Sequence, residues 1–180
     1  MNMRVFLWGF MGSGKTFLGK SLADALQVPF YDLDAEIETA TGKTISTLFA
    51  EKGEPCFRAL ETDTLHTFQH KPAFILACGG GTPCHADNAA WMKKQGITVW
   101  LNPPVEVLVK RLLPEKQHRP LLAQVPDAQL ETVIREKLAQ RSTYYSQAHL
   151  IIRDEHVDIS AFKNQLLLMA RQYMASNPHP

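Results

Sequence analysis

The sequence predicts an α/β protein with three layers, in which helices cover both faces of a five-stranded parallel sheet. Two observations carry this prediction. Short apolar runs alternate with segments of helical period along the 180 residues. The run at 73–78 also has no polar alternation, which is typical of a central parallel strand buried on both faces. No internal repeat or linker divides the chain, so we expect one domain over residues 1–180.

The composition narrows the classes of partner. A formal net charge of +1 gives no reason to expect nucleic acid or an anionic membrane as a partner. No apolar stretch approaches the ~20 residues that span a bilayer. The sequence enters its first strand without a signal peptide, and Cys56, Cys78 and Cys84 lack metal-ligand spacing. We therefore expect a cytoplasmic protein with reduced, inert thiols.

The first apolar run, residues 4–8, leads into a glycine-rich loop at residues 9–16. Gly9, Gly12 and Gly14 let the backbone adopt positive φ and approach an anion closely. The loop amides and the helix that follows would form a phosphate cradle. Lys15 would reach the β- and γ-phosphates, and the Thr16 hydroxyl would ligate Mg²⁺. With a strand before it and a helix over 17–26 after it, this pattern predicts a nucleotide-binding P-loop.

A pair of aspartates follows the second apolar run, residues 28–31. Asp32 and Asp34 are two residues apart, so at a strand end their side chains would point to the same side. One carboxylate could then approach Mg²⁺ while the other faces a second substrate. The alternative is a helix N-cap, for which Asp34 is also suited. The two roles are compatible.

Residues 34–70 carry helical patterns and no strand signal, so we expect a helical insertion here. Gly42 and Gly53 mark breaks between helices, and Pro55 suits the first turn of the third helix. Arg58 and Glu61 lie one turn apart on that helix. They could form a solvated pair, or Arg58 could face the cleft; periodicity does not decide between these.

The run at 73–78 ends in Gly79–Gly81 and lacks the acidic residue with which many P-loop proteins hold Mg²⁺. Three glycines suggest a close approach between backbone and ligand. A basic, proline-rich loop near 112–126 is the candidate lid, and its Arg119 could stabilise charge during phosphoryl transfer or be an ordinary exposed arginine. The remaining elements are expected as helices at 85–95, 105–113, 127–145 and 159–174 and strands at 97–101 and 149–152.

The ordered motifs resemble those of the shikimate kinase family. The resemblance covers residues 5 to about 152, and the combination is far more specific than the P-loop alone. The motifs are Gly9–Thr16, Asp-x-Asp at 32–34, Thr41–Ile45, Phe49, Gly53–Glu61, Gly79–Gly81, Arg119–Leu122, Arg141 and Tyr145.

The resemblance implies a P-loop kinase fold and transfer of the ATP γ-phosphoryl group to the 3-hydroxyl of shikimate, on the route to aromatic amino acids. Asp34 would be the base, with Lys15 and Arg119 stabilising the transferred group. Asp32 would reach Mg²⁺ through water, beside Thr16. Shikimate would be bound by Asp34, Arg58, Gly80, Gly81 and Arg141, and ATP by Gly12, Ser13, Gly14, Lys15, Thr16, Phe17, Arg111 and Arg119.

Two other functions stay open at this point. A different small-molecule kinase, such as a gluconate kinase, would lack the Phe-Arg-x-x-Glu arrangement that ends at Glu61. A non-catalytic nucleotide-binding module would be expected to have lost Lys15, Asp34 or Arg119, all of which are present. We expect a monomer, since no exposed apolar stripe stands out. The residues after Ile152 do not match the family's second adenine-contacting segment, and none is assigned there.

Overall fold

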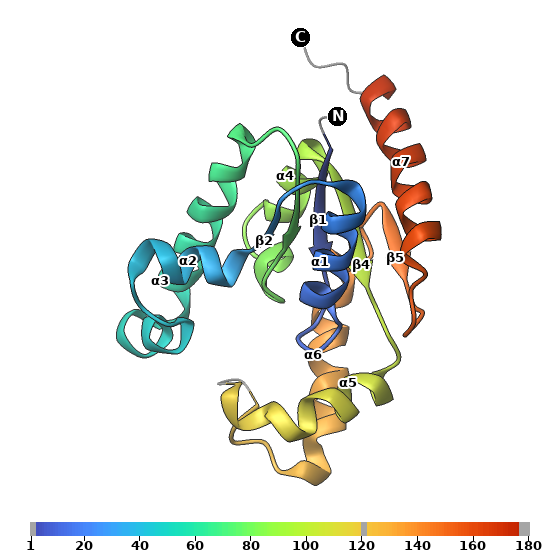
Figure 1. Cartoon of the computed structure of the whole chain (residues 1–180). Helices are drawn as coiled ribbons and strands as arrows, with labels where there is room; N and C mark the ends of the chain where they lie inside the picture. The colour runs from blue at the N-terminus through green and yellow to red at the C-terminus, as the bar shows by residue number, and fades with distance from the viewer. Residues whose placement is uncertain (1–2, 120–121, 177–180) are drawn as a thin grey trace.

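The structure is a computed structural model that describes residues 3–119 and 122–176. Within these residues a five-stranded, fully parallel sheet has the order β2-β3-β1-β4-β5 (Figure 1). The strands are β1 (Arg4–Trp8), β2 (Phe30–Asp32), β3 (Phe74–Ala77), β4 (Ile97–Leu101) and β5 (Leu150–Ile152). The predicted fold class is therefore confirmed.

Helices cover both faces of the sheet, as parallel strands joined by crossovers require. The α-helices are α1 (Lys15–Leu26), α2 (Leu33–Thr41), α3 (Ile45–Thr67), α4 (Asn88–Gln95), α5 (Val105–Leu112), α6 (Leu130–Tyr145) and α7 (Ile159–Ser176). Short 3₁₀ segments lie at Phe68–His70, Thr82–Cys84, Leu113–His118 and Asp127–Gln129.

The alternation of side chains along the central strands divides the core in two. Phe6, Trp8 and Leu76 join one apolar cluster, which α3, α4 and α6 cover. Val5 and Leu7 join the other, which is covered by α1 and α7. Because neighbouring residues of β1 belong to opposite clusters, both faces of this strand are buried. This explains the lack of polar alternation in the central runs.

A third apolar cluster supports the loops at the carboxyl ends of the strands. Phe10 of the P-loop packs there with Leu112 of α5 and with residues of α6. Leu122, from the second half of the predicted lid, is fully buried in the same cluster. The lid is therefore anchored beside the P-loop by apolar contacts.

Three details differ from the sequence prediction. The strand that precedes the aspartates ends at Asp32, and Asp34 lies in the first turn of α2. The first half of the lid is not irregular, because it forms the end of α5 and a 3₁₀ segment. The helix expected from residue 85 begins at Asn88, after a separate 3₁₀ turn. Pro120 and Leu121, in the predicted lid and the Arg119–Leu122 motif, lie outside the described residues.

The helical insertion was predicted correctly in outline. Thr44 caps α3 by accepting a hydrogen bond from the Thr47 amide, and Gly42 ends α2 in the left-handed region at φ 67°. Gly53, at φ 74° and ψ 169°, interrupts α3 with a kink. The two halves of α3 therefore run in different directions and form an arm beside the carboxyl ends of the strands (Figure 1).

Close packing holds the P-loop helix against the sheet. An added Cβ at Gly19 of α1 would lie 2.5 Å from a ring carbon of Phe30 and 3.0 Å from Leu7. We expect Gly19→Ala to lower the free energy of unfolding by about 1–3 kcal/mol despite the better helix propensity of alanine, because overpacking outweighs it. Denaturant unfolding measures this. Lys20→Ala, on the exposed side of the same helix, should change stability by less than about 0.5 kcal/mol. Equal effects of the two changes would contradict the packing argument.

Candidate active site

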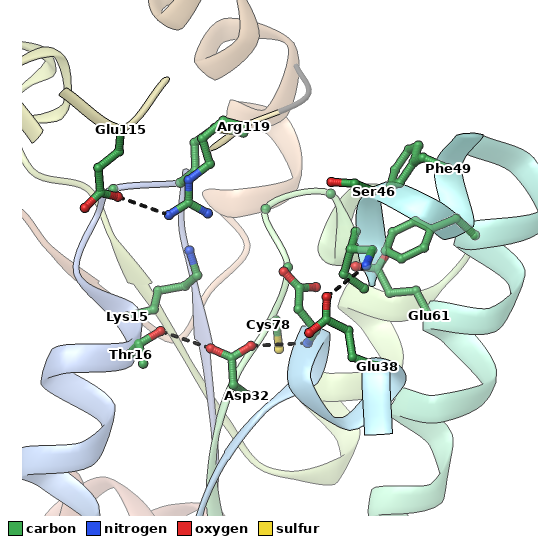
Figure 2. A pocket seen from close by; sticks show the side chains of 18 of the residues that line it. Lys15, Thr16, Asp32, Glu38, Ser46, Phe49, Glu61, Cys78, Glu115 and Arg119 are labelled. Carbon is green, nitrogen blue, oxygen red and sulfur yellow. Dashed lines mark hydrogen bonds and ion pairs between the residues drawn. The ribbon is translucent and has the colours of Figure 1, made fainter. Parts of the chain in front are cut away.

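One cleft of about 860 Å³ lies beyond the carboxyl ends of the strands. The P-loop and the lid form one side of it, and the α2–α3 arm forms the other (Figure 2). Parallel α/β sheets bind ligands at this edge. Of the predicted site residues all but Ser13 line the cleft: Gly12, Gly14, Lys15, Thr16, Phe17, Asp32, Asp34, Arg58, Gly80, Gly81, Arg111, Arg119 and Arg141.

The P-loop adopts the conformation that its glycines predict. Gly9, Gly12 and Gly14 have φ of 146°, 76° and 95°. Any Cβ at Gly9 would also lie 2.6 Å from the Leu101 carbonyl oxygen and 2.7 Å from Ser13 Oγ. Ser13 is buried under the loop, and its Oγ has no hydrogen-bond partner among the residues described. Only glycine allows this tight loop in front of α1.

The Lys15 side chain folds back over the P-loop. Its Nζ donates hydrogen bonds to the carbonyls of Gly9 and Phe10, at 2.9 and 3.0 Å. Burial lowers the pKa of the ammonium to about 8, although the nearby carboxylates of Asp34 and Asp32 oppose this shift. A bound polyphosphate would supply the negative charge that this buried cation lacks.

Asp32 and Thr16 form the oxygen-donor pair next to the P-loop. Thr16 Oγ1 donates to Asp32 Oδ2 at 3.0 Å, and the Asp34 amide donates to Asp32 Oδ1 at 3.2 Å (Figure 2). Asp32 is thus the N-cap of α2, the role that was considered for Asp34. A hydroxyl and a carboxylate oxygen at this spacing fit Mg²⁺, which takes few protein ligands and keeps phosphate and water ligands.

Asp34 stands between the two ends of the cleft with an altered pKa. Burial raises the pKa of its carboxyl to about 6, and the charges of Asp32 and Glu61 act in the same direction. Its Oδ1 lies near the backbone of Gly79. The two aspartates thus share the cleft as predicted, although Asp34 reaches it from a helix rather than from a strand end.

The Arg58–Glu61 pair is buried in the cleft and is not a solvated pair. Arg58 Nη1 donates to Glu61 Oε2 at 2.7 Å, and Glu54 binds the same guanidinium from its exposed side at 3.1 Å. The Glu61 side chain is 1% exposed and also accepts a hydrogen bond from Thr82 Oγ1 at 2.5 Å. The rings of Phe49 and Phe57 lie 6.0 and 5.3 Å from Arg58. Arg58 is therefore fixed in place before any ligand arrives.

The glycine run is explained in large part by these side chains. A Cβ at Gly79 would lie 2.5 Å from Glu61 Oε1, and one at Gly81 would lie 2.4 Å from the Arg58 guanidinium. At Gly80 the nearest atom would be Arg141 Nη1, at 3.0 Å. The close approach that the glycines predicted is thus made by the protein's own charged groups. Gly80 and Gly81 also line the cleft.

Arg141 completes the end of the cleft near the glycine run. It projects from α6, and its guanidinium lies 5.3 Å from the ring of Phe10 in the P-loop. Its Nη1 is buried and lacks a hydrogen-bond partner among the described residues. Tyr145, one turn further along α6, donates a hydrogen bond to the Gly80 carbonyl. An unpartnered, buried guanidinium nitrogen beside Arg58 is suited to a carboxylate.

Arg111 and Arg119 border the cleft on the lid side. Arg111 donates to the Gly12 carbonyl at 3.2 Å and pairs with Glu155 at 3.5 Å. Arg119 pairs with Glu115 at 3.6 Å and lies on the same side of the cleft as Lys15 (Figure 2). The 80% exposed ring of Phe17 also borders the cleft.

Three side chains support the site in ways that residue types alone did not indicate, although Glu61 was considered as a solvated partner of Arg58 and Tyr145 is one of the family motifs. Glu61, Thr82 and Tyr145 set the positions of Arg58 and of the glycine run, as described above. Only Glu61 left a signal, because it stands one turn from Arg58. Cys78, which lines the cleft, and Cys84 fit the expectation of inert thiols, since burial raises the pKa of Cys84 to about 11 and that of Cys78 well above its usual range.

A P-loop before a helix, a parallel sheet of this order and a cleft with a second, arginine-lined end define a small-molecule kinase of the P-loop class. The shikimate kinase family model matches residues 11–169. The chain therefore belongs to the shikimate kinase family. Among the described residues, no helix has the length and apolar character that crossing a membrane requires.

Individual relatives agree with the family assignment. Shikimate kinase of Bacteroides thetaiotaomicron is 42% identical over 156 residues, which are 87% of this chain and 89% of the relative. The crystal structure of shikimate kinase from that organism superposes with a TM-score of 0.85 at 39% identity, covering 94% of this chain and 98% of the other. Shikimate kinase from Acinetobacter baumannii in complex with shikimate gives a TM-score of 0.81 at 36% identity, with coverage of 99% and 96%.

The buried Arg58–Glu61 pair leads to a prediction that distinguishes the two carboxylate partners of Arg58, Glu61 and Glu54. Glu61→Ala leaves Arg58 and Thr82 without a buried partner, and we expect it to lower the free energy of unfolding by about 2–4 kcal/mol. Glu54→Ala removes the other, 58% exposed partner of the same arginine and should lower it by less than about 1 kcal/mol. Denaturant unfolding of both variants measures the difference, and similar losses would contradict the assignment of Glu61 as the anchor of Arg58.

Proposed function

We propose that this chain transfers the γ-phosphoryl group of ATP to the 3-hydroxyl of shikimate. The observation that carries the proposal is the arrangement of the cleft. A phosphate cradle lies at one end, two arginines suited to a carboxylate lie at the other, and a carboxyl group with a raised pKa stands between them. The bound shikimate in the relative from Acinetobacter baumannii supports the choice of acceptor.

At the donor end, the amides of Gly12–Thr16 bind the phosphates of ATP, and Lys15 exchanges its two carbonyl partners for phosphate oxygens. Phosphoryl transfer depends mainly on positioning and on stabilising charge on the transferred group. Lys15 provides this charge from the P-loop, and Arg119 provides it from the lid. Arg111 and Phe17, at the rim of the cleft, contact the remainder of the nucleotide.

Mg²⁺ is the proposed cofactor, held by Thr16 directly and by Asp32 through water. These two groups already share a hydrogen bond beside the P-loop, and their oxygen atoms suit a hard cation. When bound, the ion neutralises phosphate charge. Among the described residues no cluster of three or more histidine, cysteine or acidic side chains is arranged for a metal. A site with few protein ligands matches the preference of Mg²⁺.

At the acceptor end, Arg58 and Arg141 bind the shikimate carboxylate, and the backbone of Gly80 and Gly81 contacts the ring. Asp34 accepts a hydrogen bond from the acceptor hydroxyl and takes its proton as that oxygen attacks the γ-phosphorus. The carboxylate form is needed for this step. Closure of the lid over both substrates excludes water and limits hydrolysis of ATP.

The proposal also covers the oligomeric state, the location and the partners of the enzyme. We propose a monomeric, cytoplasmic enzyme of a single domain over residues 1–180, which requires neither nucleic acid nor a membrane. A gluconate kinase remains the nearest rival in fold. A gluconokinase from Sinorhizobium meliloti has a TM-score of 0.59 at only 14% identity, which is a likeness of fold alone.

The function is tested by measuring ADP release with ATP and Mg²⁺ in the presence of shikimate, quinate or gluconate. We expect turnover with shikimate and little with gluconate, because the pair of arginines and the glycine-lined end suit a ring that carries a carboxylate, and gluconate is an open chain. Quinate, which is also a ring with a carboxylate, measures how far the cleft distinguishes between ring acids. Lys15→Met is the control for contaminating kinases and should remove the activity. Absence of shikimate-dependent turnover would refute the proposal.

Asp34→Asn tests the role of the central carboxyl group. We expect kcat to fall by about 10²–10⁴-fold, since a proton acceptor is lost, while ATP binding is retained. In the wild type, kcat/KM for shikimate should fall as the pH drops below about 6, where the Asp34 carboxyl becomes protonated. Steady-state kinetics between about pH 5 and 8, with the ionic strength held constant, measure both effects. An unchanged kcat in the variant would remove Asp34 from the mechanism.

The same variant should gain stability. The pKa of Asp34 is higher in the folded protein than its ordinary value of 3.8, so the folded state loses stability as the pH rises from about 4 through about 6. Asparagine avoids this cost. Asp34→Asn should therefore be more stable than the wild type by about 1–3 kcal/mol at pH 8, and the difference should shrink as the pH falls towards 4.

A further inference from the structure

A second cavity, of about 550 Å³, shares no lining residue with the active-site cleft. It lies at the opposite edge of the sheet, because Ile97, the first residue of β4, forms part of its wall. The lining comes from α4, from the start of β4, from the segment before β5 and from the end of α7. These residues are Ala90, Lys93, Lys94, Ile97, Gln147, His149, Met169, Gln172 and Tyr173.

The charge of this cavity is of one sign. Lys93 and Lys94 line it, no carboxylate does, and neither lysine forms an ion pair within the part of the chain that the structure describes. Arg4 lies close by. Its guanidinium binds Gln95 and two backbone carbonyls rather than an acid, and its charge is felt by Tyr173. The cavity therefore presents positive potential to a ligand.

His149 presents a fixed hydrogen-bond donor. The Thr98 amide donates to its Nδ1 at 3.1 Å, so this nitrogen must be unprotonated. Thr98 Oγ1 accepts from the His149 amide and lies 2.9 Å from the same Nδ1. Burial and the neighbouring Lys93 both lower the pKa of the imidazole, which favours its neutral form. The proton is therefore on Nε2, and the ring offers an N–H group.

Apolar and aromatic groups form the rest of the wall. Ala90, Ile97 and Met169 are apolar, and the Tyr173 ring stands at 83° to the His149 ring with centroids 6.0 Å apart. The cavity thus combines apolar surface with cationic and N–H donors. Small-molecule sites have this composition. A purely inorganic anion would leave the apolar surface unused, and a neutral ring would leave the lysines unpaired.

We propose that this cavity binds a small aromatic carboxylate, with its acid group on Lys93, Lys94 and the His149 Nε2–H and its ring against the apolar wall. The site is independent of the kinase cleft. It would therefore be filled while shikimate and ATP occupy the other edge of the sheet, and it gives the enzyme a place to sense an organic acid other than its substrate.

Benzoate is the probe, and it is titrated into the complete, isotopically labelled chain while saturating shikimate fills the active site. Backbone amide resonances report the location of binding. We expect saturable shifts at Gly96, Thr98 and His149, around the cavity, and none at Gly80 in the cleft. Benzamide, which lacks the charge, and inorganic phosphate, which lacks the ring, should each bind at least about tenfold more weakly, because a charge-assisted hydrogen bond or the apolar contact is lost.

A pair of matched double variants separates the site from general charge effects. Lys93→Met with Lys94→Met should weaken benzoate binding by about tenfold or more. Lys20→Met with Lys52→Met removes the same charge from two exposed positions outside both cavities and should leave binding unchanged. Unchanged kinase turnover in both double variants shows that they are folded. The proposal is wrong if the shifts do not saturate, if they lie in the cleft, or if both double variants bind alike.

Discussion

The buried carboxylate of Glu61 is the constraint on which the acceptor end of the cleft depends. It is almost fully removed from solvent, so it must be paired, and Arg58 and Thr82 are its partners. This pairing determines where the Arg58 guanidinium lies, and the guanidinium in turn occupies the space where a Cβ of residue 81 would stand. The Arg58–Glu61 pair on α3 thus determines where the glycine run must lack side chains, although about twenty residues separate Glu61 from Gly81 in the sequence.

Burial disfavours the charged forms of the two ionisable groups at the centre of the cleft, and bound ligands would reduce this penalty. Burial favours the neutral forms of both Lys15 and Asp34, lowering one pKa and raising the other. The Asp34 carboxyl keeps its proton more firmly than an exposed aspartate, which costs stability but brings its pKa closer to neutrality. A general base works best with such a pKa. Bound polyphosphate would compensate Lys15, so the donor substrate removes the penalty at its own end of the cleft.

The P-loop could be predicted from the sequence because its chemistry is local. Gly9 to Thr16 are contiguous, and each glycine is required by the backbone of the loop itself. Arg58 and Arg141 are different, since α3 and α6 bring them together from more than eighty positions apart. Their side-chain directions depend on Glu61 and Phe10, which periodicity does not place. The resemblance to a family supplied both arginines. It supplied neither the reason why Gly79 and Gly81 are glycines nor the fact that Asp34 stands on a helix.

Three of the arginines that line the cleft, Arg58, Arg141 and Arg119, differ in how firmly their side chains are held. Arg58 is bound by two carboxylates and packed near two aromatic rings, so it contributes a fixed charge at little entropic cost on binding. Arg141 lies against Phe10 of the P-loop, and one of its buried nitrogens has no hydrogen-bond partner in residues 3–119 and 122–176, so a bound carboxylate would supply one. The Arg119 side chain is 44% exposed, and the one ion pair it forms with the residues that the structure describes is a long contact with Glu115, which is easily exchanged. The arginine-lined end of the cleft is therefore preorganised. In the proposed reaction the two charges that act on the transferred group would differ in the same way, since Lys15 is held by two backbone carbonyls and Arg119 is held only loosely.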